Sequence, residues 1–363
     1  MPGFAARRDR LRKQLRRTGA EALLISDFTN VTYLTGFTGD DSHLLVTDRE
    51  TVMLSDFRYV QQLTEECPEL DVEIRPLGTE MLDLVVRVVG ATKRRRLAVE
   101  GSSMTVGFCG ELSRRLPTLE IVPTTGLVEQ LRAIKDRDEV AEIRFAIDVA
   151  ERAFAVVRAS LRPESTEKWI ANELEYQIRL FGGEGCGFTP IVGVGPRGAL
   201  PHARLSDRQV GQSDFVLVDW GARGRLYVSD LTRVLVTGRI PPKLERIYGV
   251  VLQAQRAGIA AIRPGVLMKD VDAAARQVIE RAGWGKLFGH GLGHGIGLQV
   301  HEQPRLAANQ DRPLKPGMVV TVEPGIYIPG WGGVRIEDDV LVTRTGHEVL
   351  SRVPKELGDC VLA

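Results

Sequence analysis

The sequence has few of the features that mark secreted or membrane proteins. Its four cysteines are scattered, and no two of them form a CxxC pair: Cys67, Cys109, Cys186 and Cys360. Scattered thiols are typical of a reducing compartment, so we expect a cytoplasmic protein without disulfides. No apolar run approaches the ~18 residues that a membrane-spanning helix needs.

An excess of charge of one sign is also missing. Lysine and arginine number 48 and aspartate and glutamate 47, so the formal net charge is +1. Such a chain has no overall field that would attract nucleic acid or an anionic membrane, and we expect neither as a partner. Its 43% hydrophobic and 26% charged residues are those of an ordinary globular protein. The length of 363 residues predicts two domains at about 150 residues each.

The N-terminal segment is strongly basic, as in a transit peptide. Its basic residues are Arg7, Arg8, Arg10, Arg12, Lys13, Arg16 and Arg17. However, Asp9 interrupts the run, and the segment continues into AEALLIS without a cleavage site. We therefore predict a helix with a solvated basic face.

Residues 1–128 alternate helical and strand patterns, which indicates an α/β domain. Apolar runs at 43–47 and 51–54 flank the turn residues 48–50 and predict a hairpin. The region contains no phosphate loop and no cluster of catalytic residue types. We place the domain boundary after residue 128, which leaves 129–363 as the second domain.

The stretch Gly289–Pro304, GHGLGHGIGLQVHEQP, holds three of the six histidines of the chain: His290, His294 and His301. Alternating glycines run through it from 289 to 297. Because each glycine costs a helix roughly 1 kcal/mol relative to alanine, we expect a loop or strand here, despite the i, i+4 spacing of His290 and His294. Taken alone, the stretch favours histidines that are satisfied within a glycine-rich turn over histidines that bind a ligand.

Two predicted hairpins supply carboxylates around this stretch. In the first, strands at 215–220 and 226–237 flank a turn at 222–225. Facing residues of an antiparallel pair have numbers with a constant sum, here 449, which places Asp219 opposite Asp230. In the second, a turn at 329–332 gives a sum of 660 and places Glu323 opposite Glu337.

Opposed like charges destabilise a strand pair, so each carboxylate pair needs a cation between its members or a proton on one of them. Each hairpin follows two predicted helices, which indicates an internal duplication. Four carboxylates and one imidazole suit two divalent cations. The alternative for any single member is a surface carboxylate or a salt bridge within its hairpin.

Four motifs carry a resemblance to a known family: VDWGARGRLYVSDLTR, GHGLGHGIGLQVHEQP, VEPGIY and GVRIEDDV. The chain resembles the pita-bread metallopeptidases, and specifically the aminopeptidase P and prolidase (Xaa-Pro dipeptidase) branch. The resemblance implies an α/β (α+β) fold, with a creatinase-like N-terminal domain over 1–128. It implies a pita-bread catalytic domain over 129–363, with pseudo-twofold helix-hairpin halves.

The resemblance also implies residue roles. The metal ligands would be Asp219, Asp230, His294, Glu323 and Glu337, with Asp230 and Glu337 bridging two ions. His202 and His301 would contact the scissile peptide, and Glu323 would relay a proton. The pocket for the residue after the cleaved bond would be lined by His290, Tyr327 and Arg335. The alternative for Arg335 is an ion pair with Glu337 or Asp338 of its own strand.

The implied activity is hydrolysis of the bond between an N-terminal residue and a following proline. Two divalent ions per chain would be required, with manganese expected first and cobalt or zinc as alternatives. A homodimer is expected. The alternatives are a general or methionine aminopeptidase, a metal-free creatinase, and a metal-binding pseudoenzyme that binds peptides or partners. The segment GPRGALPH, which leads to His202, and the pair Asp40-Asp41 depart from the family pattern and concern substrate preference.

Overall fold

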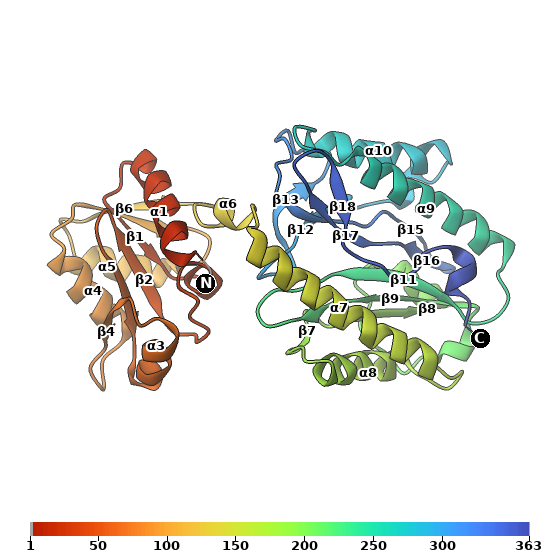
Figure 1. The fold of residues 1–363 in the computed structure, drawn as a ribbon, viewed down its shortest axis with the longest axis horizontal. Helices are drawn as coiled ribbons and strands as arrows, with labels where there is room; N and C mark the ends of the chain where they lie inside the picture. Colours follow the sequence, from red (N-terminus) through yellow and green to blue (C-terminus); the bar gives the residue numbers. More distant parts are fainter. Residues whose placement is uncertain (1–2, 363) are drawn as a thin grey trace. The chain divides into compact units, whose positions relative to one another are not determined.

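The protein is described here from a computed structural model, which defines residues 3–362. The chain divides into two compact units, Met1–Arg132 and Ala133–Ala363 (Figure 1). The division falls after residue 132, whereas the sequence placed it after residue 128. Across residues 3–362 no helix is both long and apolar enough to cross a membrane.

Unit 1, Met1–Arg132, is built on one six-stranded sheet of order β4-β3-β2-β1-β5-β6. β2 runs antiparallel to β1 and β3, and the other neighbours are parallel. The predicted hairpin is therefore confirmed as β2 and β3. The strands are β1 Ala22–Ile25, β2 His43–Thr47, β3 Thr51–Ser55, β4 Asp71–Ile74, β5 Arg96–Glu100 and β6 Glu120–Thr124.

Helices α4 and α5 contribute to the apolar core of unit 1, because their buried residues Val85 and Leu112 belong to the same cluster as Leu24 and Leu97 of the sheet. The helices are α1 Phe4–Leu15, α2 Phe28–Thr35, α3 Val60–Glu66, α4 Met81–Ala91, α5 Val106–Arg115 and α6 Glu129–Arg132.

The predicted solvated face of the basic helix is wrong for Arg7 and Arg8, which are 3% and 6% exposed. Arg7 donates to the carbonyl oxygen of Tyr33 at 3.1 Å, and Arg8 donates to that of Leu34 at 3.0 Å. Both carbonyls lie in the last turn of α2, where no helical N–H group remains to satisfy them. Guanidinium groups are favourable at this end of a helix, so they pack inward.

The first half of unit 2 begins with the long helix α7, Arg137–Ser160, whose predicted capping box between Asp136 and Glu139 is confirmed. Thr166 caps the second helix, α8. A three-stranded sheet of order β11-β9-β8 follows. The remaining bounds are α8 Glu167–Leu180, β7 Gly185–Cys186, β8 Ile191–Val194, β9 Phe215–Trp220, β10 Ala222–Arg223 and β11 Leu231–Val236.

The second half repeats this plan with two helices and a five-stranded sheet of order β13-β12-β14-β17-β18 (Figure 1). The duplicated helix-hairpin halves and the mixed α/β class predicted from the sequence are thus confirmed. The elements are α9 Pro242–Ala261, α10 Met268–Arg281, β12 Gly293–Gly295, β13 Glu302–Leu306, β14 Val319–Val322, β15 Gly325–Ile328, β16 Gly332–Arg335, β17 Asp338–Val342 and β18 His347–Val349.

Strand alternation directs the acidic side chains toward the inside of unit 2. On β9, Val218 and Trp220 pack in the core with α7 and α8, where Trp220 stacks on Phe154 at 4.0 Å between ring centroids. Leu217 belongs instead to the core that contains α9 and α10. Since successive side chains of a strand point to opposite faces, Asp219 shares the face of Leu217, toward the second half.

The predicted pairing of Asp219 with Asp230 is wrong, because Asp219 lies opposite Thr232. The connection between β9 and β11 is not a simple four-residue turn. It contains β10, which pairs with β7, and an isolated bridge between Arg223 and Val228. The register moves by two residues, and a shift of two keeps every side chain on its face. Asp230 therefore remains on the face of Asp219, at a diagonal position.

The second hairpin has the predicted register. Val322 faces Asp338 on one side of the acidic pair, and Gly325 faces Arg335 on the other, so the facing numbers add to 660 on both sides. Glu323 and Glu337 occupy the short break between these two ladders. A tight turn after β15 keeps the pairing regular, so the register could be predicted from the position of the turn.

Candidate metal centre

A cavity of about 1250 Å³ opens between the two halves of unit 2. Every one of the site residues predicted from the sequence lines it. They are His202, Asp219, Asp230, His290, His294, His301, Glu323, Tyr327, Arg335 and Glu337. The fold therefore brings together residues that are up to 135 positions apart in the chain.

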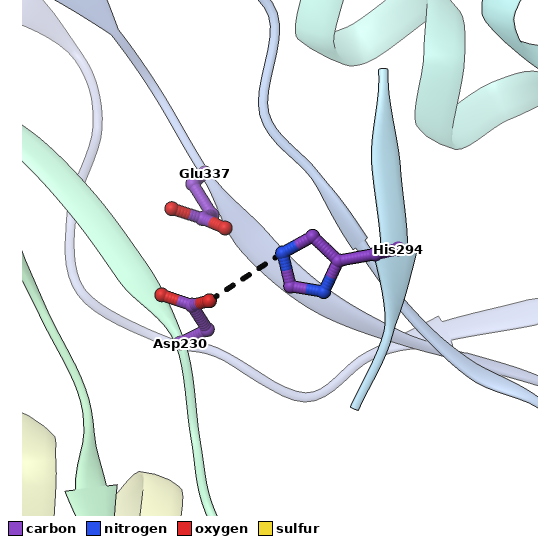
Figure 2. Close-up of side chains that lie close together, drawn as sticks. All are labelled: Asp230, His294 and Glu337. Carbon is purple, nitrogen blue, oxygen red and sulfur yellow. Dashed lines mark ion pairs between the residues drawn. The ribbon is translucent and has the colours of Figure 1, made fainter. Parts of the chain in front are cut away.

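Asp230, His294 and Glu337 form the centre of this cavity and come from three segments (Figure 2). One possible ligand atom from each lies within 4.8 Å of the others. The Nε2 atom of His294 is 3.6 Å from Asp230 Oδ2 and 3.2 Å from Glu323 Oε1. Oxygen and imidazole nitrogen donors at such separations suit a divalent cation between them.

The backbone around His294 selects the nitrogen that faces the carboxylates. Nδ1 of His294 lies 3.1 Å from the carbonyl oxygen of Gly295, which can only accept a hydrogen bond. Nδ1 must then carry the hydrogen, and in the neutral ring Nε2 keeps a lone pair for a metal. The alternating glycines have a steric reason. A Cβ atom on Gly293 would overlap the carbonyl of Thr321, and one on Gly295 would overlap that of Gln303.

The electrostatics of the site call for a positive charge. Burial and the neighbouring carboxylates raise the pKa values of Asp230 and Glu337 well above their ordinary range, and burial also raises the pKa of Asp219. Burial opposes ionisation of Glu323 too, but the hydrogen bond and charge of His294 outweigh it and lower the pKa of Glu323 to about 2. Within residues 3–362, the buried Oδ1 atom of Asp219 has no hydrogen-bond partner. The donor set thus fits divalent cations.

Metal binding at this site is expected to release protons. The pKa values of Asp230 and Glu337 are raised, and that of His294 is raised from 6.5, so these groups hold protons that a cation must displace. Below its raised pKa, each of these groups binds a proton that competes with the metal ion. Metal affinity should therefore rise with pH through and beyond 6.5. Calorimetric titration with Mn²⁺ in buffers of different ionisation enthalpy measures the protons released, and a zero count would contradict the expectation.

Arg335 is paired with the opposite half of the unit. Its Nη2 atom forms an ion pair with Asp219, its Nε donates to Thr232 Oγ1 at 3.0 Å, and its Nη1 donates to Tyr327 Oη at 2.8 Å. In the described chain it forms no ion pair with Glu337 or Asp338, which was the sequence-based alternative. The Tyr327 hydroxyl also lies 2.9 Å from Nε2 of His290. The three predicted pocket residues therefore form one hydrogen-bonded chain.

His202 and His301 lie at the open part of the cavity. The ring of His301 stands edge-on to that of His294, with 4.3 Å between centroids. Burial lowers the pKa of His301, and the neighbouring His294 lowers it further. A neutral imidazole next to the carboxylate centre can accept or donate a proton near neutral pH.

Sequence reasoning missed three polar residues that support the centre. Thr232 donates to Glu337 Oε2 at 2.5 Å, and Thr321 donates to Glu323 Oε1 at 3.2 Å. Asp339 accepts from the backbone N–H of Asp230 at 3.1 Å. Each lies two residues from a predicted ligand, so strand periodicity was the signal that could have found it.

Comparisons with known proteins identify the family of both units. A family model described as metallopeptidase family M24 matches residues 141–344, and one described as the creatinase/prolidase N-terminal domain matches 7–134. An uncharacterized peptidase of Bacillus subtilis is 39% identical over 349 residues, which are 96% of this chain and 98% of that protein.

Two solved structures are similar over nearly their full length. The Xaa-Pro dipeptidase from Bacillus anthracis is 37% identical with a TM-score of 0.94, and the match covers 99% of this chain and 100% of that one. The X-Pro aminopeptidase from Thermotoga maritima is 35% identical with a TM-score of 0.87, and the match covers 95% and 99%. The expected creatinase-like and pita-bread domains are thereby confirmed. The chain belongs to metallopeptidase family M24 and is a peptidase of its prolidase group, a family that implies divalent metal ions.

Proposed function

We propose that this protein hydrolyses the bond between an N-terminal residue and a following proline, using two divalent metal ions. The observation that carries the proposal is the convergence of four buried or nearly buried carboxylates and His294 on one cavity. So many acidic groups cannot all ionise there without about two divalent cations to offset them.

In this proposal the ligands are Asp219, Asp230, His294, Glu323 and Glu337. Asp230 and Glu337 would both be shared between the two ions, and their positions on opposite halves support this role, since one donor atom of each lies within 4.8 Å of the other. Bound divalent cations would lower the pKa of water and polarise the peptide carbonyl. Manganese is the proposed metal, with cobalt or zinc as alternatives.

The remaining residues would handle the substrate and its protons. Glu323, whose pKa is lowered to about 2, is ionised at neutral pH and can accept a proton at Oε1 or Oε2. His301 and His202 line the open side of the cavity, where they can donate to the oxygen of a peptide carbonyl under attack.

Selectivity for proline has a physical basis in this cavity. A bond before proline has no N–H group, so an enzyme cannot recognise it through that donor. The enzyme must instead bind the pyrrolidine ring of the proline and the carbonyl or carboxylate group that follows it. His290 and Tyr327 offer two flat rings, and Arg335 offers a guanidinium group that holds them in place through Tyr327.

The two solved relatives differ in their names, since one is called a dipeptidase and the other an aminopeptidase. Both names specify proline. We extend that preference to this chain and include both dipeptides and longer peptides as candidate substrates. A cytoplasmic homodimer is part of the same proposal.

The proposal predicts that Xaa-Pro substrates are cleaved far faster than Xaa-Ala analogues of the same length. The metal-loaded protein would be assayed on Ala-Pro, Ala-Pro-Ala, Ala-Ala and Ala-Ala-Ala. A ratio of kcat/KM of about 10² or more corresponds to about 2.7 kcal/mol of transition-state discrimination. Equal rates on the proline and alanine peptides would reassign the protein as a general aminopeptidase.

A further inference from the structure

Arg233 is a buried guanidinium group behind the metal centre, with a role that nothing above accounts for. It lies on β11 beside Thr232 and is 1% exposed. An arginine side chain has five N–H groups, and all five have acceptors here. Nε donates to Pro354 O at 3.2 Å, Nη1 to Thr232 O at 2.9 Å and Glu337 O at 2.6 Å, and Nη2 to Asp338 Oδ1 and Val353 O, both at 2.7 Å.

These acceptors belong to three separate segments: β11 of the first half, the start of β17 in the second half, and the C-terminal segment. The two halves are joined at this point by one isolated bridge between Thr232 and Glu337, in which the N–H of Glu337 donates to Thr232 O at 3.2 Å. Arg233 donates to the carbonyl oxygens of both bridge residues. It therefore holds together the beginnings of β11 and β17, which directly follow Asp230 and Glu337.

Asp338 completes this network on the side away from the cavity. Adjacent residues of a strand point to opposite faces, so Asp338 points away from the cavity that Glu337 lines. It is 1% exposed, accepts from Gln255 Nε2 of α9 at 2.7 Å and forms a second ion pair with Lys355. The Arg233–Asp338 ion pair is thus anchored to both a helix and the C-terminal segment.

The distance between the halves matters because a metal tolerates little error in the positions of its ligands, about 0.2 Å. Asp230 and Glu337 come from different halves, and their separation depends on how β11 and β17 meet. We propose that Arg233 is a positioning residue that sets the separation of Asp230 and Glu337 and thereby the metal affinity. The inference rests on the metal centre proposed above.

The experiment compares metal binding by the full-length wild type with that of Arg233→Met, Arg233→Lys and Asp338→Asn. Mn²⁺ affinity is measured by calorimetric titration, and the visible spectrum of the Co²⁺ form reports the ligand geometry. Arg8→Met is the matched control, because Arg8 is also a buried arginine, 6% exposed, that donates to a backbone carbonyl, but it lies in unit 1. Thermal unfolding is recorded for every variant.

Arg233→Met should weaken Mn²⁺ binding by about 10- to 100-fold, the usual effect of losing a group that orients metal ligands, and should alter the Co²⁺ spectrum. Arg233→Lys should fail to restore the affinity, because an ammonium group has three donors in place of five. Arg8→Met should lower the melting temperature and leave Mn²⁺ affinity unchanged.

A purely structural role would lower the melting temperature of the Arg233 variants without changing their Mn²⁺ affinity or Co²⁺ spectrum, and that result overturns the inference. If Arg233→Met does not fold, the same measurements of melting temperature, Mn²⁺ affinity and Co²⁺ spectrum are made on Arg233→Lys and Asp338→Asn. Unchanged affinity and spectrum in those folded variants would likewise overturn the inference. A wild-type protein that binds no metal would instead refute the proposed function, so the two failures are distinguishable.

Discussion

Removal of divalent cations from the purified protein by a chelator is expected to reduce peptidase activity to the level of the uncatalysed control. The reason lies in the acidic centre, where burial already raises the pKa values of Asp219, Asp230 and Glu337. Without a cation these groups hold protons, and the activation of water and the polarisation of the peptide carbonyl that the cations would supply are lost. Added Mn²⁺ or Co²⁺ should restore activity, with up to two ions bound per chain by elemental analysis.

The same removal should lower the melting temperature, because a ligand that binds only the folded state stabilises it. At a free metal concentration of 100 times Kd, that stabilisation is about 2.7 kcal/mol per site. Circular dichroism of the chelated protein provides the control that its fold persists. Protein that contains no metal as purified, and that neither Mn²⁺ nor Co²⁺ activates, would contradict the proposed metal centre.

Replacement of His294 or His301 by alanine is expected to abolish most activity in both cases, but for different reasons. His294 presents Nε2 to Asp230 and Glu323, so its loss should reduce the number of bound metal ions as well as kcat. His301 contacts the ring of His294 at the open side of the cavity. Its loss should keep the metals and lower kcat by about 10²- to 10⁴-fold, the usual effect of a lost proton-transfer or oxyanion partner.

Metal content and kcat measured on the same preparations separate the two roles. His347→Ala is a suitable control, since His347 is an exposed residue of β18 that does not line the cavity. It should retain wild-type metal content and kcat. If His294→Ala and His301→Ala lose metal equally, the division of roles between these histidines is wrong.

The two hairpins show when the register of a strand pair can be predicted by counting residues from the turn. The register around Glu323 and Glu337 was predicted because a short turn joins β15 and β16, so the numbers of facing residues keep the same sum on both sides of the break. The register of Asp219 was wrong by two because β10 in the connection pairs elsewhere. A local rule cannot foresee a pairing partner that lies 36 residues away, as Cys186 does from Ala222.

Burial of charged residues was harder to predict. Arg7 and Arg8 lie in a strongly basic segment, and their inward position depends on carbonyl groups of α2 that are 26 residues distant. Arg335 likewise pairs with Asp219, 116 residues away, in place of an acidic neighbour on its own strand. In each case the partner became available only through the packing of separate elements.

The sequence by itself determined the residue types of the centre, the two repeated helix-hairpin halves, and the strand face on which each carboxylate lies. These follow from motif spacing and from the alternation of side chains along a strand, both of which are local properties of the chain. Only the tertiary structure decided that Asp230, His294 and Glu337 converge within 4.8 Å, and that Arg233 joins the strands behind them. The distance between the halves depends on how their hydrophobic cores and helices pack, and local sequence rules do not contain that information.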